Sequence, residues 1–378
     1  MDILRDARVV EPANEEEVST ALGCANRDGL AVIPRGGGTK LDWGNPPARA
    51  DIVLSTAKLN RVLEHAWADL TVTVEAGCTV ADLQRTLAQH GQRLAIDVLW
   101  PERATIGGIL ATNDSGVLRL AYGALRDLVI GATLVLADGT IARSGGKVVK
   151  NVAGYDLPKL VTGAMGTLGV ITQATFRLHP LPRKTRSLTI AAGDREKAQR
   201  LLMAIEAATL AHVALQWRMA AGAEPLLDIQ FEGTAAGIEA QEVKLRELAQ
   251  PAVVAEGSPD VWLVRERVAE SKSVAKLSVL PSRIAETLEA IAKISGGDWR
   301  AVFQATGIGW LAIEAPLEQL RTYVENEGGS VTILRGSRDD ASIGAWGDTG
   351  AALALMRAVK QQFDPNGTLN PGRFVGGI

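Results

Sequence analysis

Three glycine-rich segments in the first half of the chain constrain its fold more than any other feature. The first is Arg35-Gly36-Gly37-Gly38-Thr39, and it directly follows the apolar run 30–34. Successive glycines allow positive φ and let backbone N–H groups converge on phosphate oxygens. The segment is not a Walker A loop, because no Gly-Lys-Ser/Thr follows, and it does not open a helix as Gly-x-Gly-x-x-Gly does. Alone, it could equally be a plain tight turn.

The second glycine-rich segment is longer and more polar. It begins near Pro101, continues through Thr105-Ile106-Gly107-Gly108 and Thr112-Asn113, and ends at Ser115-Gly116. Its paired glycines permit close backbone approach, and its hydroxyl and amide groups offer donors and acceptors to a polar ligand. A glycine-rich helix start is the alternative interpretation. The third segment covers 152–171 and contains Gly169-Val170-Ile171. Three such segments in order favour a ligand-binding role.

The predicted elements of this half mix helices and strands without regular alternation. Asn14 and Thr79 are typical N-caps, so helices are expected over 14–28 and 79–91. Asp138-Gly139 between two apolar runs indicates a hairpin. Strands are expected over 30–34, 51–57 and 71–75. This order favours an α+β domain over a doubly wound parallel sheet.

A stretch rich in proline and charge indicates a domain boundary. Residues 179–186 contain Pro180 and Pro182, which interrupt regular structure. We expect one domain over 1–182, a second over 187–345, and a C-terminal helix and tail over 349–378 that return to the first domain. The second domain should be an antiparallel sheet covered by helices, with helices over 195–209, 236–249, 259–271, 282–294 and 315–327, and strands over 213–219, 226–232, 275–280 and 299–313.

Charge and cysteine content exclude several classes of protein. Lys and Arg number 40 against 43 Asp and Glu, and the net charge of −3 does not suit nonspecific nucleic-acid binding. The two cysteines cannot hold an iron–sulfur cluster, which needs about four thiolates. The first residues lack a signal-peptide pattern, and no apolar run reaches the ~20 residues of a membrane-spanning helix. We therefore expect a cytoplasmic protein that associates with membranes only through partners.

The three segments and the C-terminal run at 363–374 together resemble a known family. The run reads Phe-Asp-Pro-Asn-Gly-Thr-Leu-Asn-Pro-Gly-Arg-Phe. They are similar to the flavoproteins of the vanillyl-alcohol oxidase and para-cresol methylhydroxylase type. Within that family the chain most resembles the shorter FAD-binding subunit of bacterial glycolate oxidase. The resemblance covers essentially the whole chain. It implies an α+β fold with a two-part FAD-binding domain and an antiparallel-sheet α+β cap domain.

The resemblance also implies which residues contact the cofactor. Arg35 to Thr39 would hold the pyrophosphate, and Asn370 would return from the tail to the flavin. The remaining implied contacts are Pro101, Thr105, Ile106, Gly107, Gly108, Thr112, Asn113, Ser115, Gly116, Gly169, Val170 and Ile171. Covalent flavin in the family usually needs a histidine or cysteine, and none lies in Gly36 to Gly38, so non-covalent FAD is expected. The histidines fall in no motif and are expected at the surface or in packing: His65, His90, His179 and His212.

In the second domain, the resemblance implies a site for a substrate carboxylate. Related D-2-hydroxy-acid dehydrogenases use an arginine from a Trp-x-x-Arg-Glu helix and a lysine on a following strand, and Arg265 and Lys276 match them. A guanidinium fork with an ammonium suits a carboxylate. A solvated helix face with a lysine lying along apolar surface is the alternative. The metal-binding histidines of those dehydrogenases have no counterpart in 305–312, so no metal site is predicted.

Three functions remain open at this stage. Without those histidines the substrate hydroxyl lacks an evident proton acceptor. This favours the FAD-binding subunit of a multi-subunit 2-hydroxy-acid (glycolate) dehydrogenase or oxidase, an electron relay or accessory in glycolate catabolism. Its partners in the hetero-oligomer would be a larger homologous FAD-binding catalytic subunit and an iron–sulfur subunit, with a small 2-hydroxy acid as substrate of the complex. The alternatives are a self-sufficient FAD-dependent 2-hydroxy-acid oxidoreductase and a non-catalytic flavin-bearing assembly module.

Overall fold

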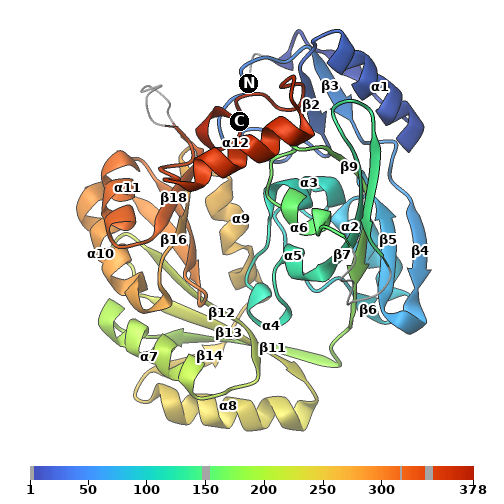
Figure 1. The fold of residues 1–378 in the computed structure, drawn as a ribbon. Helices are drawn as coiled ribbons and strands as arrows, with labels where there is room; N and C mark the ends of the chain where they lie inside the picture. The colour runs from blue at the N-terminus through green and yellow to red at the C-terminus, as the bar shows by residue number, and fades with distance from the viewer. Residues whose placement is uncertain (1–3, 147–153, 316, 337–343) are drawn as a thin grey trace. The chain divides into compact units, whose positions relative to one another are not determined.

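The computed structural model describes residues 4–146, 154–315, 317–336 and 344–378 (Figure 1). Its contacts separate into two compact units. The first unit extends to Ser115, resumes over Gly123–Leu181 and includes Asp348–Ile378. The second consists of Gly116–Tyr122 and Pro182–Gly347.

A small parallel sheet and one helix begin the first unit. The sheet has the order β1-β3-β2, and both pairings are parallel. Helix α1 (Glu15–Arg27) is capped as predicted, because the Asn14 side chain accepts a hydrogen bond from the Glu17 N–H at 2.9 Å. The strands are β1 (Arg8–Val10), β2 (Val32–Arg35) and β3 (Ile52–Ser55). Strand β2 leads directly into the first glycine segment.

A five-stranded antiparallel sheet, in the order β4-β5-β9-β7-β8, forms the larger part of the first unit. Its strands are β4 (Val62–Ala66), β5 (Thr71–Glu75), β7 (Val129–Val135), β8 (Ile141–Gly145) and β9 (Val170–Arg177). Gly139, with φ of 90°, turns the chain between β7 and β8, as the Asp-Gly pair predicts. The remaining short elements are η2 (Trp67–Asp69), α2 (Val80–Ala88), β6 (Gln92–Arg93), α3 (Ile106–Thr112), α5 (Leu125–Leu128), α6 (Leu157–Val161) and β10 (His179–Pro180).

The C-terminal segment of the chain completes the first unit. Helix α12 (Ala352–Phe363) precedes the tail, which ends in η5 (Val375–Gly377). The tail forms a parallel bridge between Leu369 and Val32, with the Val32 N–H bonded to the Thr368 carbonyl at 2.7 Å. Residues more than 300 positions apart in the sequence therefore lie side by side at β2.

The second unit is an antiparallel sheet of eight strands in the order β14-β11-β13-β12-β16-β17-β15-β18. Side chains from α7, α8, α10 and α11 share one buried apolar cluster with one face of this sheet, while α9 contacts β16 and β17. Because side chains alternate along a strand, Leu311 joins that cluster while Trp310 lies on the opposite face. The elements are α4 (Arg119–Tyr122), β11 (Lys184–Ala191), α7 (Arg195–Ala207), β12 (His212–Ala220), β13 (Leu226–Gly233), α8 (Ala235–Ala249), β14 (Val253–Glu256), η3 (Pro259–Leu263), α9 (Val264–Ala269), β15 (Val274–Ser278), η4 (Pro281–Arg283), α10 (Ile284–Ser295), β16 (Trp299–Gln304), β17 (Ile308–Ile313), α11 (Leu317–Asn326) and β18 (Ser330–Arg335).

The boundary between the units differs from the sequence prediction in two ways. Residues 184–186, expected to be irregular, begin β11 and pair with 231–233 of β13. Main-chain pairing forms this strand, since Lys184 and Thr185 are exposed and contribute no apolar pattern. Residues 116–122, expected in the first domain, belong to the second unit, where Val117 packs with Val213 and Ala214.

Gly309 lies within the stretch that the resemblance aligns with a metal motif, and its role in the structure is packing. It lies directly across from Phe303 in the β16–β17 pair, and a Cβ at Gly309 would overlap the buried Phe303 ring. We expect Gly309→Ala to lower the free energy of unfolding by about 1–3 kcal/mol, because the ring cannot move within a packed core. Urea denaturation measures this change. Gly297→Ala, at an exposed glycine with free space, is the matched control.

In the described part of the chain, no helix has the length and apolar composition needed to cross a membrane.

Candidate functional site

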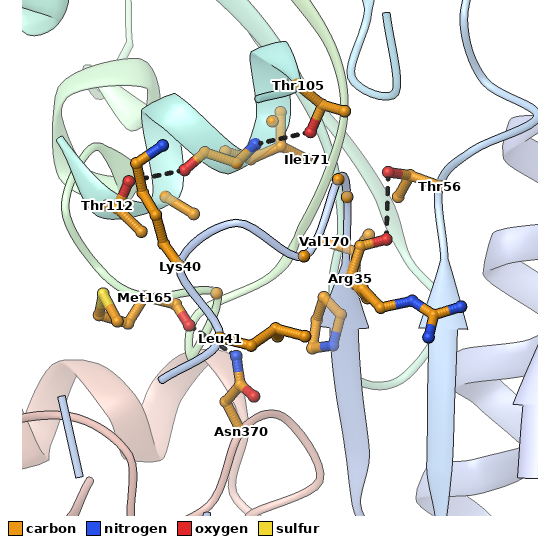
Figure 2. Close-up of a pocket in the computed structure, with 18 of the residues that line it drawn as sticks. Arg35, Lys40, Leu41, Thr56, Thr105, Thr112, Met165, Val170, Ile171 and Asn370 are labelled. Carbon is orange, nitrogen blue, oxygen red and sulfur yellow. Dashed lines mark hydrogen bonds between the residues drawn. The ribbon is translucent and has the colours of Figure 1, made fainter. Parts of the chain in front are cut away.

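A pocket in the first unit lies where the three glycine segments and the tail meet (Figure 2). Its walls come from the loop after β2, the beginning of α3, the loop before β9 and the tail residue Asn370. Most of the residues that the resemblance implied as cofactor contacts line it. They are Arg35, Gly36, Gly37, Gly38, Thr39, Thr105, Gly107, Gly108, Thr112, Gly169, Val170, Ile171 and Asn370.

Five other implied residues do not line the pocket. Ile106 lies in the apolar core of the first unit, and the Pro101 carbonyl accepts a hydrogen bond from the Ala81 N–H at 3.0 Å. Asn113 ends α3 with φ of 47°, and the Ser115 hydroxyl accepts from the Leu125 N–H at 3.2 Å. Gly116 falls in the second unit. Their contact with a cofactor stays a prediction.

Sequence reasoning missed several pocket residues. Two had an available signal, since Lys40 follows the first glycine segment directly and Arg373 lies within the C-terminal run. Met165 lies within the third segment, but an apolar side chain there gave no signal of its own, and its φ of 54° is visible only in the structure. The full set of missed residues is Pro34, Lys40, Leu41, Thr56, Ala111, Met165, Gly166 and Arg373.

The glycines of the first segment serve mainly to allow close approach. Only Gly38 has a positive φ, of 71°. A Cβ at Gly36 would overlap the Thr105 hydroxyl, and a Cβ at Gly37 would overlap the Arg103 carbonyl oxygen. The positive φ that glycines allow is therefore used at Gly38, whereas at Gly36 and Gly37 glycine is needed because the second segment leaves no room for a side chain.

The pocket presents polar groups that the protein itself does not use. Within the described residues, the N–H groups of 36–39 donate to no other protein group. The Asn370 Nδ2 donates to the Met165 carbonyl at 2.6 Å, and its buried Oδ1 has no hydrogen-bond partner among the described residues. Unpartnered buried polar atoms are costly, which indicates a ligand that completes them.

A buried ion pair adds charge to the pocket wall. The Lys40 Nζ lies 3.1 Å from Asp114 Oδ2, and the two side chains are 4% and 0% exposed. The rings of Trp43 and Trp100 flank the ammonium, with centroids 5.5 and 5.6 Å away. Asp114 also accepts a hydrogen bond from the Leu99 N–H at 2.9 Å. The pocket thus contains a cation whose charge is compensated inside the protein.

Thiol and imidazole groups do not contribute to the pocket lining. Both cysteines are free, and burial raises the pKa of the Cys78 thiol to about 11, so this thiol stays protonated at neutral pH. His90 packs against the Trp67 ring, and His212 contacts Glu206 at 2.9 Å. Among the described residues, no cluster of three or more His, Cys, Asp and Glu side chains could hold a metal ion.

In the second unit, the two predicted carboxylate-binding residues meet at one tryptophan. Arg265 of α9 is 7% exposed, and its guanidinium carbon lies 5.5 Å from the centroid of the Trp310 ring. Lys276 of β15 pairs directly across from Trp310 of β17. A solvated helix face therefore does not describe Arg265. The substrate contacts of both residues stay a prediction.

Comparisons with known families match two parts of the chain to FAD-binding proteins. Residues 7–145 match the family described as FAD binding domain, and residues 345–374 match the C-terminal domain of FAD-linked oxidases. The first match contains the first two glycine segments, and the second contains Asn370 and Arg373.

The curated relatives are oxidoreductases. A glycolate oxidase subunit of Bacillus subtilis is 36% identical over 55% of this chain and 44% of its own length. A D-lactate dehydrogenase of Archaeoglobus fulgidus is 41% identical over 52% of this chain and 44% of its own length. A D-2-hydroxyglutarate dehydrogenase of Xanthomonas citri is 28% identical over 96% of this chain and 88% of its own length. The matches to the first two relatives thus span less than half of their length.

A solved structure has the same fold as the whole chain. An alkyldihydroxyacetonephosphate synthase superposes with a TM-score of 0.74 at 17% identity, covering 97% of this chain and 77% of that one. The predicted α+β fold and FAD as the cofactor are confirmed. The pocket fits FAD, because open N–H groups at 36–39 suit a pyrophosphate and the buried Asn370 Oδ1 provides a free acceptor. A lining without histidine or cysteine agrees with non-covalent binding.

Proposed function

We propose that the chain is an FAD-dependent oxidoreductase of the para-cresol methylhydroxylase type, and that it serves as the FAD-binding subunit of a multi-subunit 2-hydroxy-acid dehydrogenase or oxidase that acts on glycolate. The observation that carries the proposal is a contrast between the two units. The first has a pocket that fits the cofactor, whereas the sequence of the second contains no histidine after His212 that could accept the substrate proton.

In this proposal, the chain's own residues bind and orient the cofactor. The backbone N–H groups of 36–39 hold the pyrophosphate, and Asn370 contacts the flavin from the tail. Bound FAD would supply two-electron acceptor chemistry. Because no evident base lies in the second unit, the hydroxy acid is oxidised in a larger homologous FAD-binding subunit, and this chain acts as electron relay or accessory.

The proposed partners follow from what the chain lacks. Its two cysteines cannot form an iron–sulfur cluster, so a separate iron–sulfur subunit would carry electrons onward. The assembly is proposed to be a cytoplasmic hetero-oligomer, and membrane contact, where it occurs, is made by a partner.

Purification of the tagged chain from its native host tests this proposal. We expect a second flavoprotein and an iron–sulfur protein to copurify in fixed ratio, with FAD bound to each flavoprotein. Glycolate-dependent dye reduction should require the complex. A chain that elutes alone and oxidises glycolate at the full rate would contradict the proposal.

A self-sufficient oxidoreductase is the second candidate function. Its support is the arrangement at Trp310, where the Arg265 guanidinium lies over the ring and Lys276 lies directly across from Trp310 in the strand pair. A guanidinium and an ammonium on one face of the sheet would suit a substrate carboxylate.

Replacing Arg265 separates these two functions. If this chain is accessory, Arg265→Ala leaves the KM of the complex for glycolate within about twofold of the normal value, and we expect this result. A rise of about tenfold or more would favour the second candidate, because a carboxylate contact would have been lost. Steady-state kinetics of the reconstituted complex give the KM. Arg267→Ala, at an exposed arginine of the same helix, is the matched control.

A further inference from the structure

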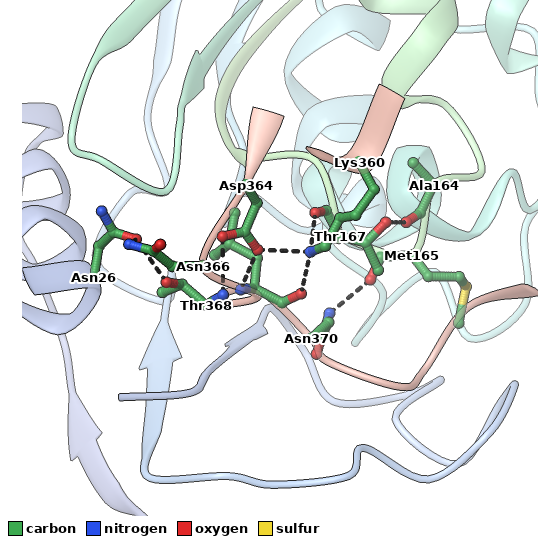
Figure 3. A network of polar contacts seen from close by, with 10 residues as sticks. Asn26, Ala164, Met165, Thr167, Lys360, Asp364, Asn366, Thr368 and Asn370 are labelled. Carbon is green, nitrogen blue, oxygen red and sulfur yellow. Dashed lines mark hydrogen bonds and ion pairs between the residues drawn. The ribbon is translucent and has the colours of Figure 1, made fainter. Parts of the chain in front are cut away.

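A buried ion pair, Lys360–Asp364, lies in the polar network that holds the C-terminal tail (Figure 3). Lys360 of α12 donates from Nζ to the Asp364 carboxylate at 2.6 Å, to the Thr167 carbonyl at 2.8 Å and to the Leu369 carbonyl at 2.9 Å. These three bonds use all three N–H donors of the ammonium. Lys360 therefore connects the helix, the loop before β9 and the tail.

The Asp364 carboxylate of this pair accepts hydrogen bonds from two backbone N–H groups of the tail. Asp364 Oδ1 accepts a hydrogen bond from the Thr368 N–H at 2.9 Å, and Oδ2 accepts from the Leu369 N–H at 2.7 Å. The Asp364 side chain is fully buried, and that of Lys360 is 12% exposed. Burial lowers the pKa of the Lys360 ammonium, although Asp364 opposes this change, so the protein keeps the charge there at a cost. Neither residue lines the pocket.

The residues beside this pair do line the pocket. Met165 and Asn370 have φ of 54° and 44°, in the left-handed region that side chains other than glycine rarely adopt. The Asn370 amide bonds to the Met165 carbonyl at 2.6 Å, so the two unfavourable conformations support one another. Each lies within two residues of a group that Lys360 holds, the carbonyls of Thr167 and Leu369.

The same tail also reaches the first glycine segment. The Asn370 N–H bonds to the Val32 carbonyl on β2 at 3.0 Å. Further along, Arg373 donates to the carbonyl oxygens of Lys40 and Leu41 at 3.0 and 2.7 Å. A displaced tail would therefore disturb both sides of the pocket.

We propose that Lys360 and Asp364 are positioning residues, here called the tail clasp, which hold Met165 and Asn370 in place so that the pocket is ordered before FAD binds. The inference rests on the cofactor assigned in the proposed function, and it does not depend on the substrate or the partners. Cofactor affinity then depends on two residues that do not line the pocket. If the ordered pocket were only partly populated, the apparent Kd would rise by the reciprocal of that population.

FAD titration of the flavin-free full chain tests the tail clasp. Lys360→Met removes three donors at similar side-chain length, and we expect the Kd for FAD to rise about tenfold or more. Hydrogen exchange in the flavin-free protein should accelerate at 164–170 and 368–374 but remain normal in β5. Lys293→Met, which breaks an exposed pair with Glu289 of the same spacing, should change neither quantity.

Two results would overturn the inference. One is an unchanged Kd for FAD, which would show that the pocket orders without the clasp. The other is a raised Kd with exchange accelerated throughout the first unit, which would assign to the pair a merely structural role.

A milder variant is available in case Lys360→Met does not fold. Asn26 accepts hydrogen bonds through Oδ1 from the Asn366 side chain at 3.1 Å and from the Thr368 hydroxyl at 2.9 Å. Asn26→Ala loosens the tail from its exposed side. We expect a rise of about twofold to fivefold in the Kd for FAD, with faster exchange at 368–374. A normal Kd despite that faster exchange would contradict the inference.

Discussion

Gly37→Asp is expected to yield a protein purified without FAD. The new Cβ would overlap the Arg103 carbonyl oxygen, so the first glycine segment must move away from the second. The carboxylate would also place negative charge at the proposed pyrophosphate site. We expect the Kd for FAD to rise by at least about a hundredfold, equivalent to about 2.7 kcal/mol. Flavin absorbance of the purified protein and titration with FAD measure this change.

The control for this variant is Gly297→Asp, an exposed glycine in the second unit with space for a side chain. The same Gly37→Asp protein also tests the role of the flavin in the complex. An electron relay predicts that partners still copurify but activity is lost, whereas a structural flavin predicts loss of assembly. Gly37→Asp protein that retains FAD at the normal Kd would contradict the pocket assignment.

Asp114→Asn is expected to destabilise the first unit strongly. The change puts a neutral amide in place of the carboxylate that lies 3.1 Å from the buried Lys40 ammonium. Removing one member of a buried pair typically costs about 3–5 kcal/mol, since the remaining charge stays desolvated. Urea denaturation of the wild-type and variant proteins measures the loss. A matched control is Glu289→Gln, which removes the carboxylate of an exposed ion pair and should leave the free energy of unfolding nearly unchanged.

The double variant Lys40→Met/Asp114→Leu distinguishes charge from packing. Replacing both charges with apolar side chains of similar size often restores stability, so we expect the double variant to exceed Asp114→Asn in stability. Because Lys40 also lines the pocket, the double variant should bind FAD more weakly than the wild-type protein does. A loss of less than about 1 kcal/mol in Asp114→Asn would show that the pair is not effectively buried.

Local sequence signals predicted a large part of the fold. Asn14 and Thr79 begin helices as caps, and Asp138-Gly139 forms a hairpin. Several strands were not predicted, among them β1, β4, β9, β11, β14 and β18, and the single strand expected over 299–313 is the antiparallel pair β16 and β17. Strand β14 lies at an edge of the sheet with Val253 and Glu256 exposed, so it has no clear alternation of apolar and polar residues. Pairing with distant strands forms it, and a local pattern cannot reveal that pairing.

The candidate site was predictable where glycine was the signal. Residues 35–39 line the pocket together with Thr105, Gly107 and Gly108, because close backbone approach requires glycine there. Contacts that depend on the three-dimensional path of the chain gave no such signal. Met165 reaches the pocket through an unusual φ, and Lys40 does so through a buried partner 74 positions away in the sequence, Asp114. Such pairs become visible only in three dimensions.

The visible spectrum of the chain purified alone, recorded before and after anaerobic addition of glycolate and of D-lactate, tests the central claim most directly. The account predicts flavin absorption bands that acid precipitation releases as free FAD. These bands should stay oxidised with either acid until the larger flavoprotein subunit is added. Prompt bleaching of the isolated chain by glycolate would contradict the accessory role, and a colourless protein that takes up no FAD would contradict the account as a whole.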